Sequence, residues 1–146
     1  MYSVLLAEDS EDDRHLFEIA VSRVPGLKLI GEVNDGFEAI DYLEGKDEYS
    51  DRSRFPVPDV LLLDLKMPRI DGLEVLRWLQ TRTSKPRTIV LSGSDLMKDV
   101  EQAMALGADE FRVKPNTAAQ MVQMLQSVLA QAQSHLGPQR SPASSA

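Results

Sequence analysis

Short apolar runs alternate along the chain with longer segments in which apolar residues recur at helical spacing. Three of the runs are nearly continuous in apolar residues, which is typical of strands buried on both faces in a parallel sheet covered by helices. The predicted strands are residues 3–7, Leu27–Val33, Val60–Asp64, residues 88–91 and Glu110–Val113.

Helical periodicity fills the intervals between the predicted strands. Ser10 has the character of an N-cap, with Asp13 three residues later in a capping-box position, and Pro25 and Gly26 stop this helix. Gly107 stands where a glycine commonly ends a helix. The predicted helices run from Ser10 to about Val24 and over residues 36–43, 72–81, 96–106 and 117–136.

Strands that alternate with helices favour right-handed βαβ units and a parallel sheet. The predicted fold class is therefore α/β: a flavodoxin-like, doubly wound, five-stranded parallel sheet in the order 2-1-3-4-5, with five flanking helices. We expect one domain over residues 1–136 and a disordered tail of Pro, Ser and Ala over residues 137–146. The polar segment 44–58, which precedes the third strand, is expected to be a solvated surface loop.

Composition narrows the function classes. The 146 residues fit one domain, and the net charge of −7 argues against non-specific binding to nucleic acid, so we expect no DNA partner. The chain has no cysteine, which excludes disulfides, thiolate metal sites and cysteine nucleophiles. No segment has the character of a signal peptide or a membrane span, so we expect a cytoplasmic protein with no membrane partner.

Acidic residues stand at the ends of the first and third predicted strands, where a doubly wound sheet binds its ligands. Glu8 and Asp9 follow the first strand, and Asp64 ends the third. Carboxylates brought together there would repel one another, and a divalent cation such as Mg²⁺ would offset that repulsion. The alternative is that each residue merely caps a loop, which is less probable for all three than for one.

The other two strand ends supply complementary groups. Ser92 ends the fourth strand, and its hydroxyl could donate to a phosphoryl oxygen, although a serine there is more often a turn former. Lys114 ends the fifth strand and could neutralise the carboxylates, although a solvated surface lysine is the ordinary alternative. The Lys114–Pro115 bond is a candidate for the cis form. Together these groups suit phosphoryl transfer to the Asp64 carboxylate.

Five motifs in order resemble the receiver domain of two-component response regulators. They are LLAEDSEDD, NDGFEAI, DVLLLDLKMPRIDGLEVL, TIVLSGS and GADEFRVKP, and they span about residues 2–130. The long loop before the third strand and the lack of an output domain are similar to single-domain regulators that pair with phytochrome-type sensor kinases.

The resemblance implies a role for each matching residue. Asp64 would be the phosphoacceptor, and the Mg²⁺ (or Mn²⁺) ligands would be Asp9, Asp64, the main-chain carbonyl of Lys66 and, directly or through water, Glu8. Ser92 and Lys114 would contact the phosphoryl group. Ser92 and Phe111 would act as the switch pair, while Lys66 and Ser94 would tune the phosphoryl lifetime.

The resemblance also implies the partners. A sensor histidine kinase would phosphorylate Asp64, and the face of the fourth helix, fifth strand and fifth helix would then bind an unknown downstream protein. The fifth helix has a broad apolar arc, so the same face is a candidate homodimer interface, although a core-facing helix is the simpler interpretation. An intermediate phosphorelay carrier or a phosphate sink remain open as alternatives.

An enzyme is the least favoured alternative. A phosphatase with an aspartyl nucleophile would need a second acidic residue two positions after Asp64, where the chain has Lys66. We therefore expect a protein that supports only its own phosphorylation and dephosphorylation.

Overall fold

The sheet of the computed structural model, which describes residues 1–93 and 96–136, has five parallel strands. They are β1 (Tyr2–Ala7), β2 (Leu27–Val33), β3 (Val60–Asp64), β4 (Arg87–Ser92) and β5 (Glu110–Val113). Their order is β2-β1-β3-β4-β5, and each hydrogen-bonded pair is parallel. The predicted flavodoxin-like topology is confirmed.

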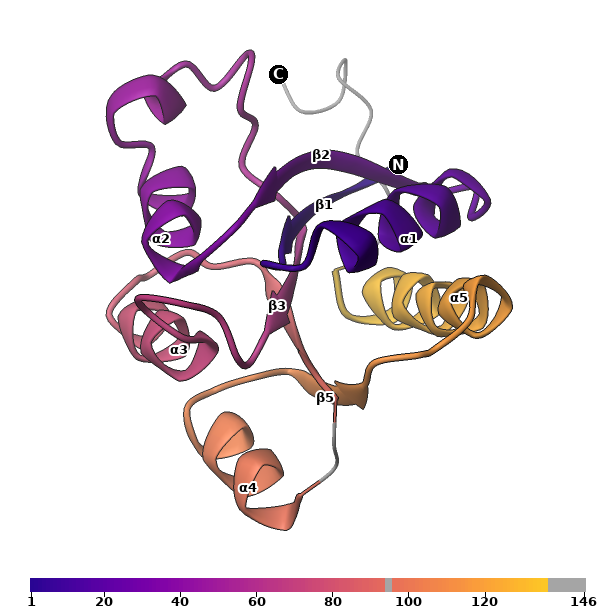
Figure 1. Ribbon diagram of the computed structural model, residues 1–146. Helices are drawn as coiled ribbons and strands as arrows, with labels where there is room; N and C mark the ends of the chain where they lie inside the picture. Colours follow the sequence, from indigo (N-terminus) through magenta and orange to yellow (C-terminus); the bar gives the residue numbers. More distant parts are fainter. Residues whose placement is uncertain (94–95, 137–146) are drawn as a thin grey trace.

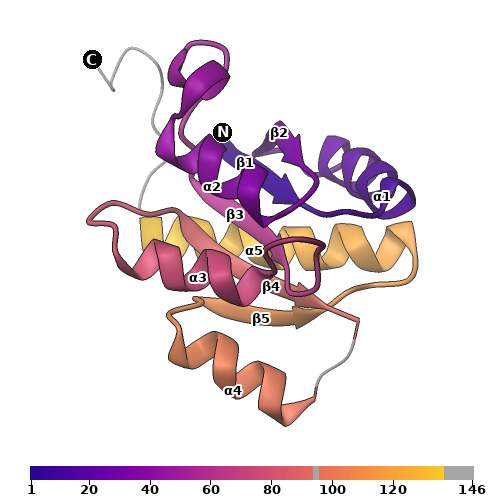
Figure 2. The same ribbon diagram turned by 60° about the vertical axis from the view of Figure 1, so that its left-hand side comes forward.

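Two helical layers enclose the sheet. The helices are α1 (Glu11–Ser22), α2 (Gly36–Glu44), α3 (Gly72–Gln80), α4 (Met97–Ala105) and α5 (Ala118–Leu136), with a short 3-10 helix η1 (Asp47–Ser50). Helices α1 and α5 cover one face of the sheet, and α2, α3 and α4 cover the other, as Figure 1 shows. Figure 2 shows α3 in front of the sheet and α4 below β5. None of the described helices is long and apolar enough to cross a membrane.

The central strand divides its side chains between two apolar cores. Val60 and Leu62 of β3 pack with α1 and α5, whereas Leu61 and Leu63 pack with α2 and α3. All five residues of β3 are buried, so its last residue, Asp64, is held at the rim of the sheet by the most rigid part of the core.

Capping places the helix starts beside the strand ends. The side chains of Ser10, Asp35 and Asp71 each accept a hydrogen bond from the main-chain nitrogen three residues later. Gly107 has a φ of 96° and follows α4, as predicted for a terminating glycine.

Two local expectations differ from the structure. Helix α1 ends at Ser22 rather than near Val24, since the backbone turns at Arg23 before Pro25. The Lys114–Pro115 bond is trans, because no cis bond occurs within the described residues. The predicted tail 137–146 lies outside the described residues, so its disorder stays a prediction.

Most residues of the segment 44–58 are exposed, as predicted for a solvated surface loop, but part of the segment packs against α2. It contains η1, and its Tyr49 and Phe55 rings stand 5.0 and 6.0 Å from the Tyr42 ring of α2. Arg52 donates to the main-chain carbonyls of Tyr42, Leu43 and Phe55 at 2.8–3.2 Å. The aromatic contacts and this guanidinium fold the polar segment back onto α2.

Candidate functional site

Three carboxylates meet at the C-terminal rim of the sheet, between β1 and β3. Glu8, Asp9 and Asp64 each offer an oxygen, and these oxygens all lie within 4.8 Å of one another. Glu8 and Asp64 are buried, whereas Asp9 is exposed. The structure thus brings together the acidic residues that the strand-end argument had placed there.

Lys114 lies among these carboxylates. Its Nζ is 2.6 Å from Glu8 Oε1 and 3.2 Å from Asp64 Oδ2, and 3.1 Å from Oδ2 of Asp13 on α1. The main-chain nitrogen of Lys114 donates to the Ser92 carbonyl at 2.7 Å, which aligns the residue after β5 with the end of β4. The alternative of a solvated surface lysine is wrong, because only 19% of the side chain is exposed.

The site carries more negative than positive charge. Of the four carboxylates of Glu8, Asp9, Asp13 and Asp64, all but that of Asp9 contact the Lys114 ammonium group. Burial raises the pKa of Glu8 to about 7, although hydrogen bonds from Lys114 and the Ser10 main chain act in the opposite direction. Burial lowers the pKa of Lys114, but Glu8, Asp64 and Asp13 together raise it further. Lys114 is therefore a permanent cation here.

The donor set suits a hard divalent cation. Carboxylate oxygens are the ligands that Mg²⁺ and Mn²⁺ prefer, and the exposed Asp9 leaves the cluster open to water on one side. Such a cation would offset the burial of the Glu8 carboxylate, which is the main cause of its raised pKa, and the smaller repulsion from Asp64. The residues present fit a magnesium-type site.

The loop after β1 is held by groups that the sequence analysis did not identify as part of the site. Arg14 of α1 donates from Nη1 to the main-chain carbonyls of Glu8 and Asp9, at 2.9 and 3.2 Å. Asp13 had been assigned only to helix capping, yet its carboxylate pairs with Lys114. Both residues lie in the first turn of α1, and no spacing rule for strand-end chemistry points to them.

The loop after β3 begins at the phosphoacceptor candidate. The main-chain nitrogen of Lys66 donates to Asp64 Oδ1 at 3.3 Å, and the Lys66 side chain is exposed. Gly72 donates from its main chain to the Leu65 carbonyl, and a Cβ at Gly72 would lie 2.6 Å from the Asp64 carbonyl oxygen. Only glycine allows α3 to begin this close to Asp64.

The remaining predicted residues lie on β4, on β5 and in the connection after β4. Ser92 is buried and ends β4, one residue beyond the Leu91 that pairs in register with Asp64. Phe111 is half-buried on β5 and packs against the core on the side of α3 and α4. Ser94 lies outside the described residues.

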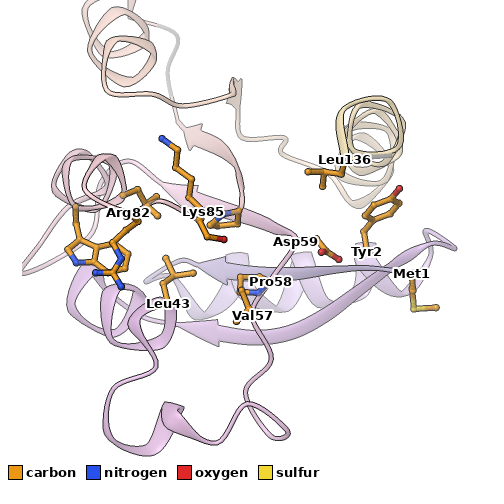
Figure 3. A pocket seen from close by; sticks show the side chains of 13 residues that line it. Met1, Tyr2, Leu43, Val57, Pro58, Asp59, Arg82, Lys85 and Leu136 are labelled. Carbon is orange, nitrogen blue, oxygen red and sulfur yellow. The ribbon is translucent and has the colours of Figure 1, made fainter. Parts of the chain in front are cut away.

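A separate cavity of about 590 Å³ lies at the opposite end of the sheet (Figure 3). Its lining includes Met1, Asp59, Arg82, Lys85 and Leu136, and none of the acidic rim residues. The main-chain nitrogen and the hydroxyl of Ser3 hold the Asp59 carboxylate. The cavity is thus remote from the carboxylate cluster.

Comparison with known proteins agrees with this geometry. The family model of the response regulator receiver domain matches residues 4–126. A protein-glutamate methylesterase/protein-glutamine glutaminase of Methanospirillum hungatei is 35% identical over 117 residues, which are 79% of this chain and 31% of that protein. The nitrate/nitrite response regulator NarL of Escherichia coli is 32% identical over 112 residues, covering 77% of this chain and 47% of NarL. The chain thus spans about a third to a half of these relatives.

Solved structures cover nearly the whole chain. The phosphorylated cyanobacterial phytochrome response regulator RcpA has a TM-score of 0.79 at 27% identity, covering 97% of this chain and 98% of RcpA. The regulator RPA3017 of red light signalling in R. palustris also has a TM-score of 0.79, at 33% identity over 88% of this chain and 91% of RPA3017. The Mn²⁺-bound form of Rcp1 has a TM-score of 0.76 at 26% identity, covering 97% and 98%. With its sheet order, its carboxylate cluster and the match over residues 4–126, the chain belongs to the family of response regulator receiver domains.

Proposed function

We propose that this receiver domain accepts a phosphoryl group on Asp64 from a sensor histidine kinase, in a step that requires Mg²⁺ or Mn²⁺. The observation that carries the proposal is the position of the Asp64 carboxylate. It lies within 4.8 Å of the Glu8 and Asp9 oxygens and 3.2 Å from the Lys114 ammonium. A buried carboxylate between an acidic pair and a lysine suits attack on phosphorus better than a structural role.

The chain's own residues would divide the work as follows. One Asp64 carboxylate oxygen forms the bond to phosphorus while the bond from phosphorus to the kinase histidine nitrogen breaks, and the imidazole, which carries a proton on its other ring nitrogen, leaves as the neutral base. Lys114 exchanges its contact with the free carboxylate for one with a phosphoryl oxygen, and the Ser92 hydroxyl donates to another.

The metal ligands would be Asp9, Asp64 and the main-chain carbonyl of Lys66, with Glu8 acting directly or through water. Bound there, the cation would neutralise negative charge on the phosphoryl oxygens. The Mn²⁺-bound form of Rcp1 supports the binding of a divalent cation by similarity.

Phosphorylation would be communicated by Ser92 and Phe111. Ser92 lies at the rim beside Asp64, and Phe111 is half-buried on the neighbouring strand β5. Movement of Ser92 toward the phosphoryl group would free space into which the aromatic ring turns. That change would alter the face of α4, β5 and α5, which is where we place the unknown downstream partner.

The decisive test measures intact mass after incubation with acetyl phosphate. We expect the gain of one phosphoryl mass in the presence of Mg²⁺, no gain with EDTA, and no gain for Asp64→Asn. Absence of the adduct with metal present would overturn the proposal. Continuous turnover of added phosphate esters would instead support a phosphatase.

The similarity to RcpA and RPA3017 supports a phytochrome-type kinase as the phosphodonor. Competition assays would separate the pathway roles. A relay carrier passes its phosphoryl group to a histidine of a second protein, a sink loses it to water, and an endpoint keeps it while it binds a target.

A homodimer remains a proposal, and most of the exposed apolar side chains that could form its interface lie outside α5. The buried arc of α5, which includes Met121, Leu125 and Val128, packs into the domain's own core. Exposed apolar side chains lie mainly at the start and along the length of α4 and on β5; they are those of Leu96, Met97, Met104 and Val113, whereas on α5 the exposed one is Leu136 at its last residue. Sedimentation velocity that shows only monomer at high concentration, with and without a phosphoryl mimic, would contradict a dimer.

A further inference from the structure

An ion pair between the buried Asp35 carboxylate and the largely exposed Arg69 side chain joins the start of α2 to the loop that follows the phosphoacceptor. Asp35 caps α2 through Oδ1, which accepts from the Glu38 main chain at 2.9 Å. Its Oδ2 accepts from both Nε and Nη2 of Arg69, at 3.0 and 2.7 Å. Only 10% of the Asp35 side chain is exposed, so its charge is offset mainly by this one guanidinium.

The same two segments touch at two further points. The main-chain nitrogen of Gly36 donates to the Ile70 carbonyl at 3.0 Å, and a Cβ at Gly36 would lie 2.2 Å from that oxygen. The Arg69 guanidinium stands over the exposed Phe37 ring, 4.8 Å from its centroid. Residues 69 and 70 are thus docked on the first turn of α2.

The Arg69 backbone shows why this docking needs a strong contact. Its φ is 64°, in the left-handed region that residues with side chains rarely adopt. Such a conformation persists only where the surroundings hold it. The guanidinium bound to Asp35 is the contact that Arg69 itself supplies.

Lys66 lies between the two fixed ends of this loop. At the near end, Leu65 donates to the Leu91 carbonyl and accepts from Gly72. At the far end, Arg69 and Ile70 are docked on α2. Lys66 has an exposed side chain and a long 3.3 Å main-chain contact to Asp64, so its carbonyl is held through its neighbours: the buried Leu65 and Met67, and the docked residues beyond them.

We propose that Asp35 and Arg69 are a positioning pair for the metal site. By docking the far end of the loop on α2, they hold the main-chain carbonyl of Lys66 where it can bind the divalent cation beside Asp64. This inference rests on the proposed function, since it assigns a role to the loop only if a cation binds among Glu8, Asp9 and Asp64.

The sign of the effect separates positioning from simple electrostatics. If Arg69 acted only through its charge, its removal would make the site more negative and would tighten Mg²⁺ binding, while Asp35→Asn would weaken it. If the pair positions the loop, both substitutions weaken binding. Their combination then weakens it no further, because either change alone breaks the same contact.

The experiment is calorimetric titration of Mg²⁺ into the full chain without a phosphodonor. We expect Arg69→Ala and Asp35→Asn each to lower the affinity by about tenfold, the low end for contacts that support metal ligands. Asparagine caps helices as well as aspartate does, so Asp35→Asn keeps the start of α2. Arg69→Lys keeps the charge without the paired donors and should lose most of the same affinity.

Arg77→Ala is the matched control. It removes the same charge and an arginine–carboxylate pair, the exposed contact with Glu74 at 2.5 Å on α3. Its affinity should equal that of the wild type. Circular dichroism would verify that every variant is folded before titration.

Each outcome has a definite meaning. Suppose the wild type binds Mg²⁺ and Arg69→Ala binds it equally or more tightly. That result would overturn the positioning role and leave the proposed function intact. Opposite effects of Arg69→Ala and Asp35→Asn on the affinity would have the same meaning. A wild-type chain that binds no divalent cation would overturn the metal-dependent function itself, and the positioning role with it.

Discussion

At the scale of single residues, the site combines buried carboxylates, which are costly to ionise, with an ammonium group that stabilises their charge. Glu8 is fully buried and Asp64 nearly so, and the Lys114 ammonium contacts both. Burial is the main cause of the raised pKa of Glu8, and the nearby negative charge of Asp64 raises it further. Any change that removes negative charge without breaking a Lys114 contact should therefore stabilise the metal-free fold.

Asp9→Asn makes that change. Asp9 is exposed and lies within 4.8 Å of Glu8 and Asp64, so removal of its charge should raise the free energy of unfolding in EDTA by about 1 kcal/mol. Urea denaturation measures this directly. Excess MgCl₂ should stabilise the wild type more than the variant, because the variant lacks the proposed Asp9 ligand. A variant that is less stable in EDTA, or that gains equally from magnesium, would contradict the repulsion argument.

We propose that Lys66 influences the lifetime of the phosphorylated state. Its exposed side chain follows Asp64 by two residues, so the ammonium and its long stem can cover and pair with the phosphoryl oxygens. We expect Lys66→Asn to shorten the half-life of the phosphoprotein severalfold. Decay of the adduct after removal of the phosphodonor, followed by intact mass, tests this expectation. Equal half-lives would remove Lys66 from the account.

Most of these residues could be predicted because strand ends in a parallel sheet converge at one rim. Glu8, Asp9, Asp64 and Lys114 follow from that rule alone. Asp13, Arg14 and the pair of Asp35 and Arg69 could not be found this way, because their roles depend on how loops bend over the first turns of α1 and α2. Sequence spacing does not specify those bends.

At the scale of secondary-structure elements, the segment 44–58 shows how a polar sequence can still pack. Tyr42, Tyr49 and Phe55 form mutual ring contacts, with centroids 5.0–6.0 Å apart. Charge and proline content predicted a solvated loop. Composition alone does not reveal that one guanidinium donates hydrogen bonds to three main-chain carbonyls. Strands and helices were predictable because each repeats its periodicity over several residues, whereas this segment has none.

Arg52→Ala tests that packing. It leaves the carbonyls of Tyr42, Leu43 and Phe55 without their charged donor, so the free energy of unfolding should fall by about 1.5–3 kcal/mol. Arg54→Ala is the control, because the Arg54 side chain is exposed and stands only over the Phe55 ring. Urea denaturation should show little change for Arg54→Ala. Equal effects of the two substitutions would argue that Arg52 is not the anchor.

Gly72→Ala tests the junction between β3 and α3. The added methyl group would lie 2.6 Å from the Asp64 carbonyl oxygen, and a backbone atom cannot move aside as a flexible side chain can. We expect a loss of about 1–3 kcal/mol in stability, together with weaker magnesium binding. A Cβ at Gly93 meets no atom within 4 Å, so Gly93→Ala should leave stability nearly unchanged. If Gly72→Ala were as harmless as that control, the proposed crowding at Asp64 would be wrong.

At the scale of the whole molecule, the central strand of the sheet is buried, whereas one edge of the sheet is covered by a helix with exposed side chains. β3 is buried along its length between two helical layers, and it delivers Asp64 to the rim. β5 is an edge strand beside α4, whose Met97 and Met104 are exposed, so a rearrangement on this side disturbs little of the core. The alternation of strands and helices predicted this architecture, and the simpler interpretation of α5, a helix whose apolar arc packs into the domain's own core, is confirmed.

The central claim is that Asp64, and no other carboxylate of the cluster, receives the phosphoryl group. Borohydride reduces an aspartyl phosphate to homoserine, so treatment of the phosphorylated chain followed by peptide mass spectrometry identifies the acceptor. We predict homoserine at position 64, only in samples phosphorylated with Mg²⁺. Homoserine at position 9 or 13, or none in a sample that carries the phosphoryl mass, would contradict the account.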